Sequence, residues 1–299
     1  MSTLGRVKCA VLGSRGLVAQ RLLQRLSNHH WLAPVCVVGS SESEGMKVSE
    51  IPWSFRETKP SLPEFRIIGI GQNGELASNL ISEGVRIVFS ALPDSPASYI
   101  EEELAKAGLV VISHSTVHRH SQLIPLVVPG VNNDHLGLID LQSGFGKGML
   151  VSCPNCMVVP LGISIAPLIR SLQVKKITIT TEQSLSGGGR RMLEKSRQGQ
   201  FPNRHIAGES LSVERELQRI LGKFDGTNLS RGNEFVPSEV TIDFEKKWYL
   251  NKRLEGACNH STRGHIKEDL YRYLYSAIIA ERFGTSTKLS YFPRGLLPK

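Results

Sequence analysis

Residues 7–29 read VKCAVLGSRGLVAQRLLQRLSNH and contain the pattern that decides the fold. The apolar run over residues 7–13 is typical of a buried strand, and residues 17–29 carry leucines at helical spacing. The turn GSRG between them places two glycines where the strand ends and the helix begins. A strand, a glycine-rich turn and a helix in this order predict the first unit of a dinucleotide-binding parallel sheet.

The same alternation continues through the first half of the chain. Further apolar runs occur at residues 33–41, 66–70, 85–92 and 109–115, with a helical pattern at 96–108. Strands that alternate with helices predict a parallel sheet with crossover helices. We therefore expect an α/β protein whose residues 1–155 form an NAD(P)-binding, Rossmann-type parallel sheet.

The pattern changes after Cys156. Helical patterns occur at residues 157–172, 211–224 and, less regularly, 268–284, and strand patterns occur at 174–184 and 238–250. The strand patterns alternate β-branched with polar residues, as strands buried on one face do. We expect a second, α+β domain for catalysis and dimerisation over residues 156–299.

The glycine-rich turn has the features of a phosphate-binding loop. Gly13 and Gly16 permit a tight turn and close backbone approach, and Ala19 occupies the third position, which small residues can fill. Amide groups at the start of the helix can then face a pyrophosphate. The sequence therefore predicts a dinucleotide cofactor.

The end of the second strand bears on which dinucleotide is bound. Small hydroxyls and a cation accept the 2′-phosphate of NADP, whereas a carboxylate binds the ribose hydroxyls of NAD. Ser40, Ser41 and Lys47 favour NADP, and Glu42 argues for NAD. We expect NADP, with NAD as the alternative.

Composition and charge narrow the classes of partner. Of 299 residues, 40% are hydrophobic and 21% are charged, as in ordinary globular proteins. The net charge of +9 fits either an uninvolved basic surface or an anionic ligand. Dispersed basic residues and 6% aromatics do not suit nucleic acid. The apolar run at residues 157–169 is too short for a membrane span, and the N-terminus lacks a signal-peptide layout. We expect a cytoplasmic protein with no nucleic-acid or membrane partner.

The segment VSCPNCM, residues 151–157, contains two of the five cysteines. A zinc site needs about four ligands, and no second Cys-x-x-Cys pair is present, so we expect no metal. A redox pair and two core-filling cysteines remain alternatives. The strand pattern MLVSC contains Cys153, so we expect Cys153 to be buried. We favour a nucleophile at Cys156, because it lies where a strand ends and an apolar helix begins, and a helix N-terminus stabilises a thiolate. A nucleophilic thiol beside a dinucleotide suggests attack on an acyl or aldehyde carbon followed by hydride transfer.

Several separate motifs resemble aspartate-semialdehyde dehydrogenases, especially the archaeal and fungal branch. They are VLGSRGLVAQRLLQRLSNHHWL, FSALPDSPASYIEEELAKAG, PLVVPGVNNDHL, SCPNCMVVPLG and TTEQSLSGGG, in order between about residues 6 and 190. The resemblance implies NADPH-dependent reduction of aspartyl β-phosphate to the semialdehyde, in the biosynthesis of lysine, methionine and threonine. It also implies a homodimer or homotetramer acting on a small acyl phosphate or aldehyde.

The resemblance assigns roles position by position. Cys156 matches the nucleophile, and Asn155 matches the neighbour that helps to hold the substrate phosphate. Gln183 matches the glutamine that orients the substrate, and Arg119 falls at the position of a phosphate-binding arginine. Glu209 matches a substrate-binding carboxylate.

Further roles concern the general acid–base and the cofactor. His265, in the segment RGH, matches the general acid–base of the family. The expected cofactor contacts are Gly13, Ser14, Arg15, Gly16, Leu17, Val18, Ser40, Ser41, Ser90, Leu92, Ser186, Gly187 and Gly188.

The chain also departs from the family pattern. Ser212 stands where the family has a lysine, and His260 stands where an arginine binds the substrate carboxylate, with Arg263 as a possible substitute. Glu42 stands where an arginine often faces the NADP phosphate, and we find no clear copy of the glycine- and alanine-rich C-terminal helix. These departures leave two alternatives open: the same chemistry on another acyl phosphate or an acyl-CoA, and a non-catalytic dinucleotide-binding relative.

Overall fold

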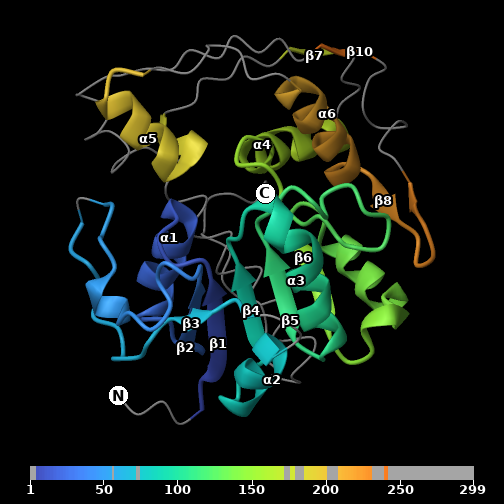
Figure 1. The fold of residues 1–299 in the computed structure, drawn as a ribbon. Coiled ribbons are helices and arrows are strands. Elements are labelled where there is room, and N and C mark those ends of the chain that lie inside the picture. The colour runs from blue at the N-terminus through green and yellow to red at the C-terminus, as the bar shows by residue number, and fades with distance from the viewer. Residues whose placement is uncertain are drawn as a thin grey trace.

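The computed structural model describes residues 5–55, 57–71, 75–171, 176–178, 185–200, 208–230 and 239–241. Its centre is a six-stranded sheet in which every pairing is parallel. The strands are β1 (Val7–Leu12), β2 (Leu32–Gly39), β3 (Ile68–Gly69), β4 (Ile87–Ser90), β5 (Val110–Ser113) and β6 (Met149–Ser152) (Figure 1). Their order, β3-β2-β1-β4-β5-β6, is that of the dinucleotide-binding doubly wound fold. The predicted Rossmann-type sheet is confirmed.

Helices cover both faces of this sheet. One face carries α1 (Leu17–Leu26), α4 (Val158–Ser171) and α6 (Glu209–Ile220), and the other carries α2 (Glu75–Ser82) and α3 (Asp94–Lys106). A further helix, α5 (Gly189–Arg197), lies against residues 185–188. The described residues also form 3₁₀ helices, namely η1 (Val48–Glu50), η2 (Asn133–Leu141), η3 (Ser143–Phe145) and η4 (Leu185–Gly188). In Figure 1, α4 and α6 lie side by side at the end of the molecule opposite α2, and α5 lies at that end but apart from them.

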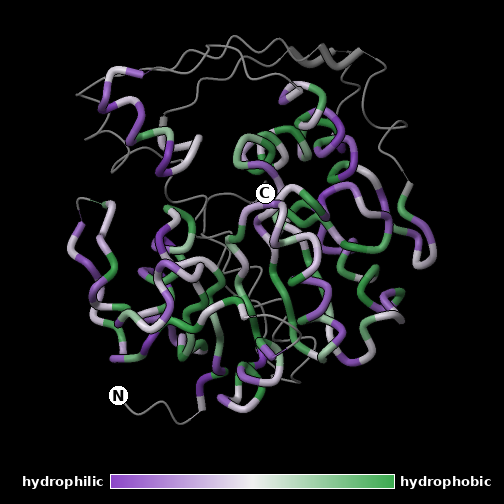
Figure 2. The backbone as a smooth tube through the Cα atoms, viewed as in Figure 1, coloured by the Kyte–Doolittle hydropathy of each residue, from purple (hydrophilic) through white to green (hydrophobic). Residues whose placement is uncertain are grey.

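Alternating side chains of the strands build two cores, one on each face. Cys9, Val11 and Phe89 belong to the core under α1, α4 and α6, whereas Ala10 and Val88 belong to the core under α2 and α3. Residues buried on both faces are expected of a parallel sheet with helices on each side. Figure 2 accordingly shows mostly hydrophobic strands between helices of mixed polarity.

Two small sheets lie outside the central one. Strands β7 (Lys176–Thr178) and β10 (Glu239–Thr241) pair in parallel, and β8 (Lys223–Phe224) and β9 (Leu229–Ser230) form an antiparallel pair. β7 and β10 fall within the two predicted strands at 174–184 and 238–250. The predicted helix at 268–284 lies outside the described residues.

The first core continues past the predicted domain boundary at residue 155. Val158, Val159 and Ala166 of α4, together with Val213 and Ile220 of α6, pack into the same cluster as the strands of the sheet. These two helices therefore complete one face of the N-terminal sheet. Within the described part of the chain, no helix is long and apolar enough to cross a membrane.

Candidate active site

The glycine turn lies at the switch point of the sheet. Gly13 follows β1 with φ of +102°, a conformation that favours glycine, and a Cβ there would lie 3.2 Å from the carbonyl oxygen of Ala91. The amide of Gly13 donates to Val38, and the amide of Ala91 donates to Leu12. The turn thus sits between the carboxyl ends of β1 and β4, where the strand order reverses and dinucleotides bind.

The start of α1 suits a phosphate group. Gly16 occupies the N-cap position, no side chain caps this described helix, and the space around Gly16 is open. The first-turn amides therefore face outward at the positive end of the helix dipole. The residues present fit the pyrophosphate of a dinucleotide.

Two interactions fix the turn after β2 against the glycine loop. Ser14 and Ser43 are buried, and their Oγ atoms are 3.0 Å apart. An Arg15 guanidinium nitrogen lies 3.1 Å from Oε2 of Glu42, and this pair is largely exposed. A Cβ at Gly39 would meet Ser43 Oγ at 2.4 Å, so the close approach requires glycine there.

The remaining predicted cofactor residues lie in different environments. Ser40 and Ser41 are exposed at the end of β2, as a cofactor contact requires. Ser90 and Leu92, in contrast, are buried, so their side chains belong to the core at the end of β4. Ser186, Gly187 and Gly188 are exposed in η4, and Gly16, Leu17 and Val18 open helix α1.

The two cysteines of VSCPNCM differ sharply in environment. Cys153 directly follows β6, is 5% exposed, and burial raises its pKa to about 12. Cys156 is half-buried in the turn that leads into α4. Because a thiolate is the nucleophile, Cys153 is unsuited to the role, whereas Cys156 lies at a helix start within reach of a ligand.

The amides around Cys156 are partly engaged within the protein. The amide of Asn155 donates to Oε2 of Glu216 at 2.6 Å, and the amide of Met157 donates to Oδ1 of Asn155 at 2.9 Å. The carbonyl of Asn155 accepts from Val158, so Asn155 acts as a cap for the first turn of α4. An oxyanion hole built from the amides of both Asn155 and Met157 would require these bonds to break.

Arg119 is not open to a ligand in this structure. It is 8% exposed, and its guanidinium donates to the carbonyls of Cys153 and His114 and pairs with Glu216. The residue lies beside the Cys156 loop, as its predicted role requires. Its contacts are internal, so its expected role as a phosphate ligand stays a prediction.

One face of α6 points toward the same loop. Ser212 Oγ lies 3.2 Å from Glu216 Oε1, and Glu209, two turns before Glu216, shares this face by helical periodicity. The family lysine would therefore stand at Ser212, directly beside Glu216. Gln183, Arg263 and His265, with His260, lie outside the described residues.

Glu216 is the functional candidate that we did not predict from the sequence. It is fully buried, yet it contacts both Arg119 and the amide preceding Cys156. The amphipathic pattern of residues 211–224 assigns position 216 to the buried face of the helix. Charged residues are rarely buried without a partner, so a glutamate on this face could have identified Glu216 as a candidate.

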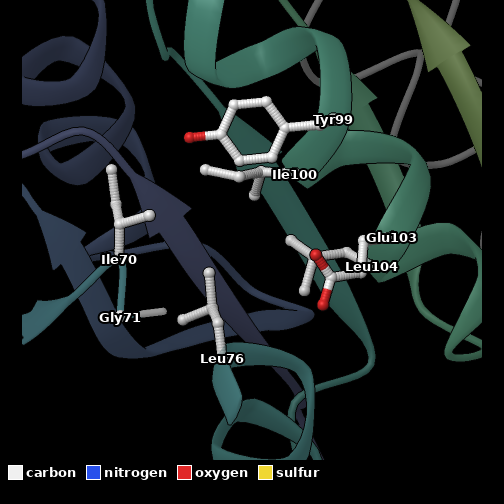
Figure 3. A pocket seen from close by; sticks show the side chains of 7 residues that line it. All are labelled: Ile70, Gly71, Leu76, Tyr99, Ile100, Glu103 and Leu104. Atoms are coloured by element: carbon white, nitrogen blue, oxygen red, sulfur yellow. The ribbon is translucent and has the colours of Figure 1, made fainter. Parts of the chain in front are cut away.

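The small cavity between α2 and α3 does not extend this site. Figure 3 shows Tyr99, Ile100, Glu103 and Leu104 of α3 facing Leu76 of α2 across it. Its volume is about 50 Å³. Ligand pockets usually measure roughly 300–1,000 Å³, so the cavity cannot hold a nucleotide.

Comparison with known proteins agrees with this geometry. A family model described as the semialdehyde dehydrogenase NAD binding domain matches residues 8–139. The aspartate-semialdehyde dehydrogenase of Archaeoglobus fulgidus is 32% identical over 241 residues, covering 79% of this chain and 66% of that protein. A malonyl CoA reductase (NADP) of Metallosphaera sedula is 33% identical over 196 residues, covering 61% of this chain and 50% of that protein.

Solved structures give the same result. The aspartate semialdehyde dehydrogenase with NADP from Candida albicans superposes with a TM-score of 0.66 at 27% identity, covering 82% of this chain and 69% of that one. The chain spans at most about two thirds of the length of the curated relatives cited above. Motifs, fold and relatives agree, and the chain belongs to the aspartate-semialdehyde dehydrogenase family.

Proposed function

We propose that the protein reduces aspartyl β-phosphate to aspartate β-semialdehyde with NADPH, through a thioester on Cys156. The observation that carries the proposal is the placement of two features on one edge of the sheet. The glycine turn follows β1, and the half-exposed Cys156 follows β6 at the same carboxyl edge. These strands are three positions apart, or about 14 Å at the usual strand spacing. A dinucleotide extended along this edge can span such a distance.

The chemistry follows from this placement. The Cys156 thiolate attacks the acyl carbon, and phosphate leaves with the electron pair of the broken C–O bond, which yields a thioester. When bound, NADPH supplies the hydride that reduces the thioester carbon. Cleavage of the C–S bond then releases the aldehyde and restores the thiolate. His265 is the proposed acid–base, and the product would enter lysine, methionine and threonine biosynthesis.

An assay in the reverse direction tests the proposal. Purified protein is incubated with aspartate semialdehyde, phosphate and NADP, and NADPH formation is followed by absorbance. We expect turnover that requires phosphate and is lost in Cys156→Ser. Binding of NADP without turnover of any aldehyde would instead support the non-catalytic alternative.

An acyl-CoA reductase is the second candidate. The observation that favours it is the internal engagement of Arg119, because a guanidinium held by two protein carbonyls and by Glu216 is less available to a substrate phosphate. Malonyl-CoA with NADPH is the matching assay. Faster turnover of the CoA thioester than of aspartyl phosphate would favour this candidate.

A further inference from the structure

The carboxylate of Glu216 lies in the protein interior with three partners. Oε2 accepts the amide of Asn155 at 2.6 Å, whereas Oε1 accepts from Arg119 and from Ser212 Oγ, each at 3.2 Å. The side chain is fully buried on α6. These contacts connect α6 to the loop that follows β6.

Arg119 approaches the same loop with its other nitrogens. Its Nε donates to the carbonyl of Cys153 at 3.1 Å, and another nitrogen donates to the carbonyl of His114, just after β5, at 3.2 Å. The guanidinium thus joins β5, the cysteine loop and α6. A planar fork with several fixed donors is suited to such a junction.

Together these contacts hold the backbone immediately before the nucleophile. Arg119 binds the carbonyl of Cys153, Glu216 binds the amide of Asn155, and only Pro154, with its restricted φ, lies between. We propose that Arg119 and Glu216 form a positioning pair, here called the loop clamp, that fixes residues 153–155 and thereby the place of the Cys156 sulfur. The inference rests on the proposed role of Cys156 as nucleophile.

A purely structural explanation accounts poorly for this arrangement. A buried ion pair is often no more stabilising than well-packed apolar residues of the same volume. What apolar residues could not supply is the acceptor for Asn155 and the donor for Cys153. Both of these groups lie within three residues of Cys156. Positional precision in this range affects reaction rates strongly, since a displacement of about 1 Å can cost a hundredfold.

Two substitutions at Glu216 separate positioning from general stability. Glu216→Asp keeps the charge beside Arg119 but withdraws the carboxylate by one C–C bond, about 1.5 Å, from the amide of Asn155. Glu216→Gln keeps the length and an acceptor oxygen but leaves the buried Arg119 unneutralised. The control is Glu214→Gln on the same helix, where the carboxylate contacts only the partly buried Gln218 among the described partners.

The loop clamp predicts opposite rankings for rate and stability. Glu216→Asp should lower kcat per folded molecule by about tenfold or more. It should also speed amide hydrogen exchange in the segment 153–157, with a small change in Tm. Glu216→Gln should lower Tm more and kcat less. Cofactor affinity should stay within about twofold in both variants, and Glu214→Gln should match the wild type.

Three results would overturn the inference. They are unchanged exchange in the segment 153–157, a kcat that simply follows Tm across the variants, and exchange that rises equally throughout the protein. If Glu216→Gln fails to fold, Ser212→Ala, which removes one contact to the same carboxylate, takes its place and should give a smaller local effect. Hydrogen exchange needs no substrate, so the loop clamp is tested even if the proposed reaction is not observed.

Discussion

Cys153 follows strand β6 and is buried, whereas Cys156 lies three residues later, half-exposed, in the turn before α4. We predict that Cys156→Ser abolishes turnover, because a serine hydroxyl ionises far too weakly to replace a thiolate. Cys153→Ser should retain most of the activity, with some loss of stability from placing a hydroxyl in the core. Steady-state kinetics and thermal melts of both variants test this. Equal loss of activity in the two would contradict the assignment of Cys156.

Arg15 and Glu42 bear on the choice of cofactor. Their ion pair is exposed and therefore weak, so Arg15 can turn to a 2′-phosphate at the end of β2. We expect Arg15→Ala to weaken NADPH binding about tenfold while NADH binding hardly changes, and Glu42→Gln to strengthen NADPH binding. Calorimetric titration measures both. Lys106→Ala is the control, because that cation lies in the last turn of α3 and pairs with Glu102 on the same helix. Equal weakening for both cofactors would place Arg15 at the shared pyrophosphate instead.

Burial explains which residue roles the sequence could predict. The strand pattern before Cys153 predicts a buried thiol, and the structure confirms it. The environment of Arg119 depends on Glu216, which lies 97 residues further along the chain. Local spacing carries no information on such a pair. The resemblance therefore gave Arg119 a ligand role, while the structure shows its contacts to be internal.

At the scale of elements, regular hydrophobic periodicity was sufficient to predict helices and strands. The irregular connections between them could not be predicted in this way. The strands β1, β2, β4 and β5 and the helices α1, α3, α4 and α6 occur where their patterns predict them. The long connection between β2 and β3 was not predicted in detail. It is anchored by Gln20 of α1, which bonds the backbone at Pro52 and Ser54. The side-chain amide of Gln20 leaves no periodic pattern in the sequence of residues 40–67, so the conformation of this loop could not be predicted.

His135 links η2 to the end of α6. It is fully buried, its Nε2 donates to the carbonyl of Gly222 at 3.1 Å, and its Nδ1 accepts from Asn132 at 2.8 Å. Burial lowers the pKa of His135. The hydrogen bond to Gly222 and the nearby Asp134 oppose this shift, and Arg219 adds to it. The neutral form is therefore favoured in the folded state. Its stabilising effect is present above the unfolded-state value of about 6.5 and is lost as the pH falls through the lower folded-state pKa.

Urea unfolding of the wild type should accordingly show falling stability below about pH 6.5. His135→Gln should cost about 1–3 kcal/mol at pH 7.5, since buried partners lose their bonds, and should flatten the dependence between pH 6.5 and 5. His30→Gln, at an exposed position, is the control. It should change neither the stability at pH 7.5 nor the pH dependence of unfolding. An unchanged slope in His135→Gln would assign the acid sensitivity to another group.

At the scale of the whole molecule, the predicted domain boundary at residue 155 lies within one continuous hydrophobic core, which contains residues from both sides of it. The resemblance places the cofactor domain before this residue, and the last strand of the sheet, β6, does end at Ser152. However, Val158 and Val159 of α4 and Val213 and Ile220 of α6 are buried in the cluster that covers one face of that sheet. Sequence patterns identify elements but not which face of a sheet a later helix covers.

A fragment of residues 1–155 should therefore be unstable by itself. Each large apolar side chain that loses its cover costs roughly 1.5–3 kcal/mol. The loss over several of them is comparable with the roughly 5–15 kcal/mol that stabilises a whole domain. We expect the fragment to bind a hydrophobic dye and to unfold without a cooperative transition. The longer fragment 1–230 retains α4 and α6, so it should melt cooperatively and bind the dinucleotide. Circular dichroism melts and dye fluorescence of the two fragments decide the matter. A cooperative, dye-free melt of the fragment 1–155 would mean that the sheet needs neither helix, and that the division at residue 155 is a true domain boundary.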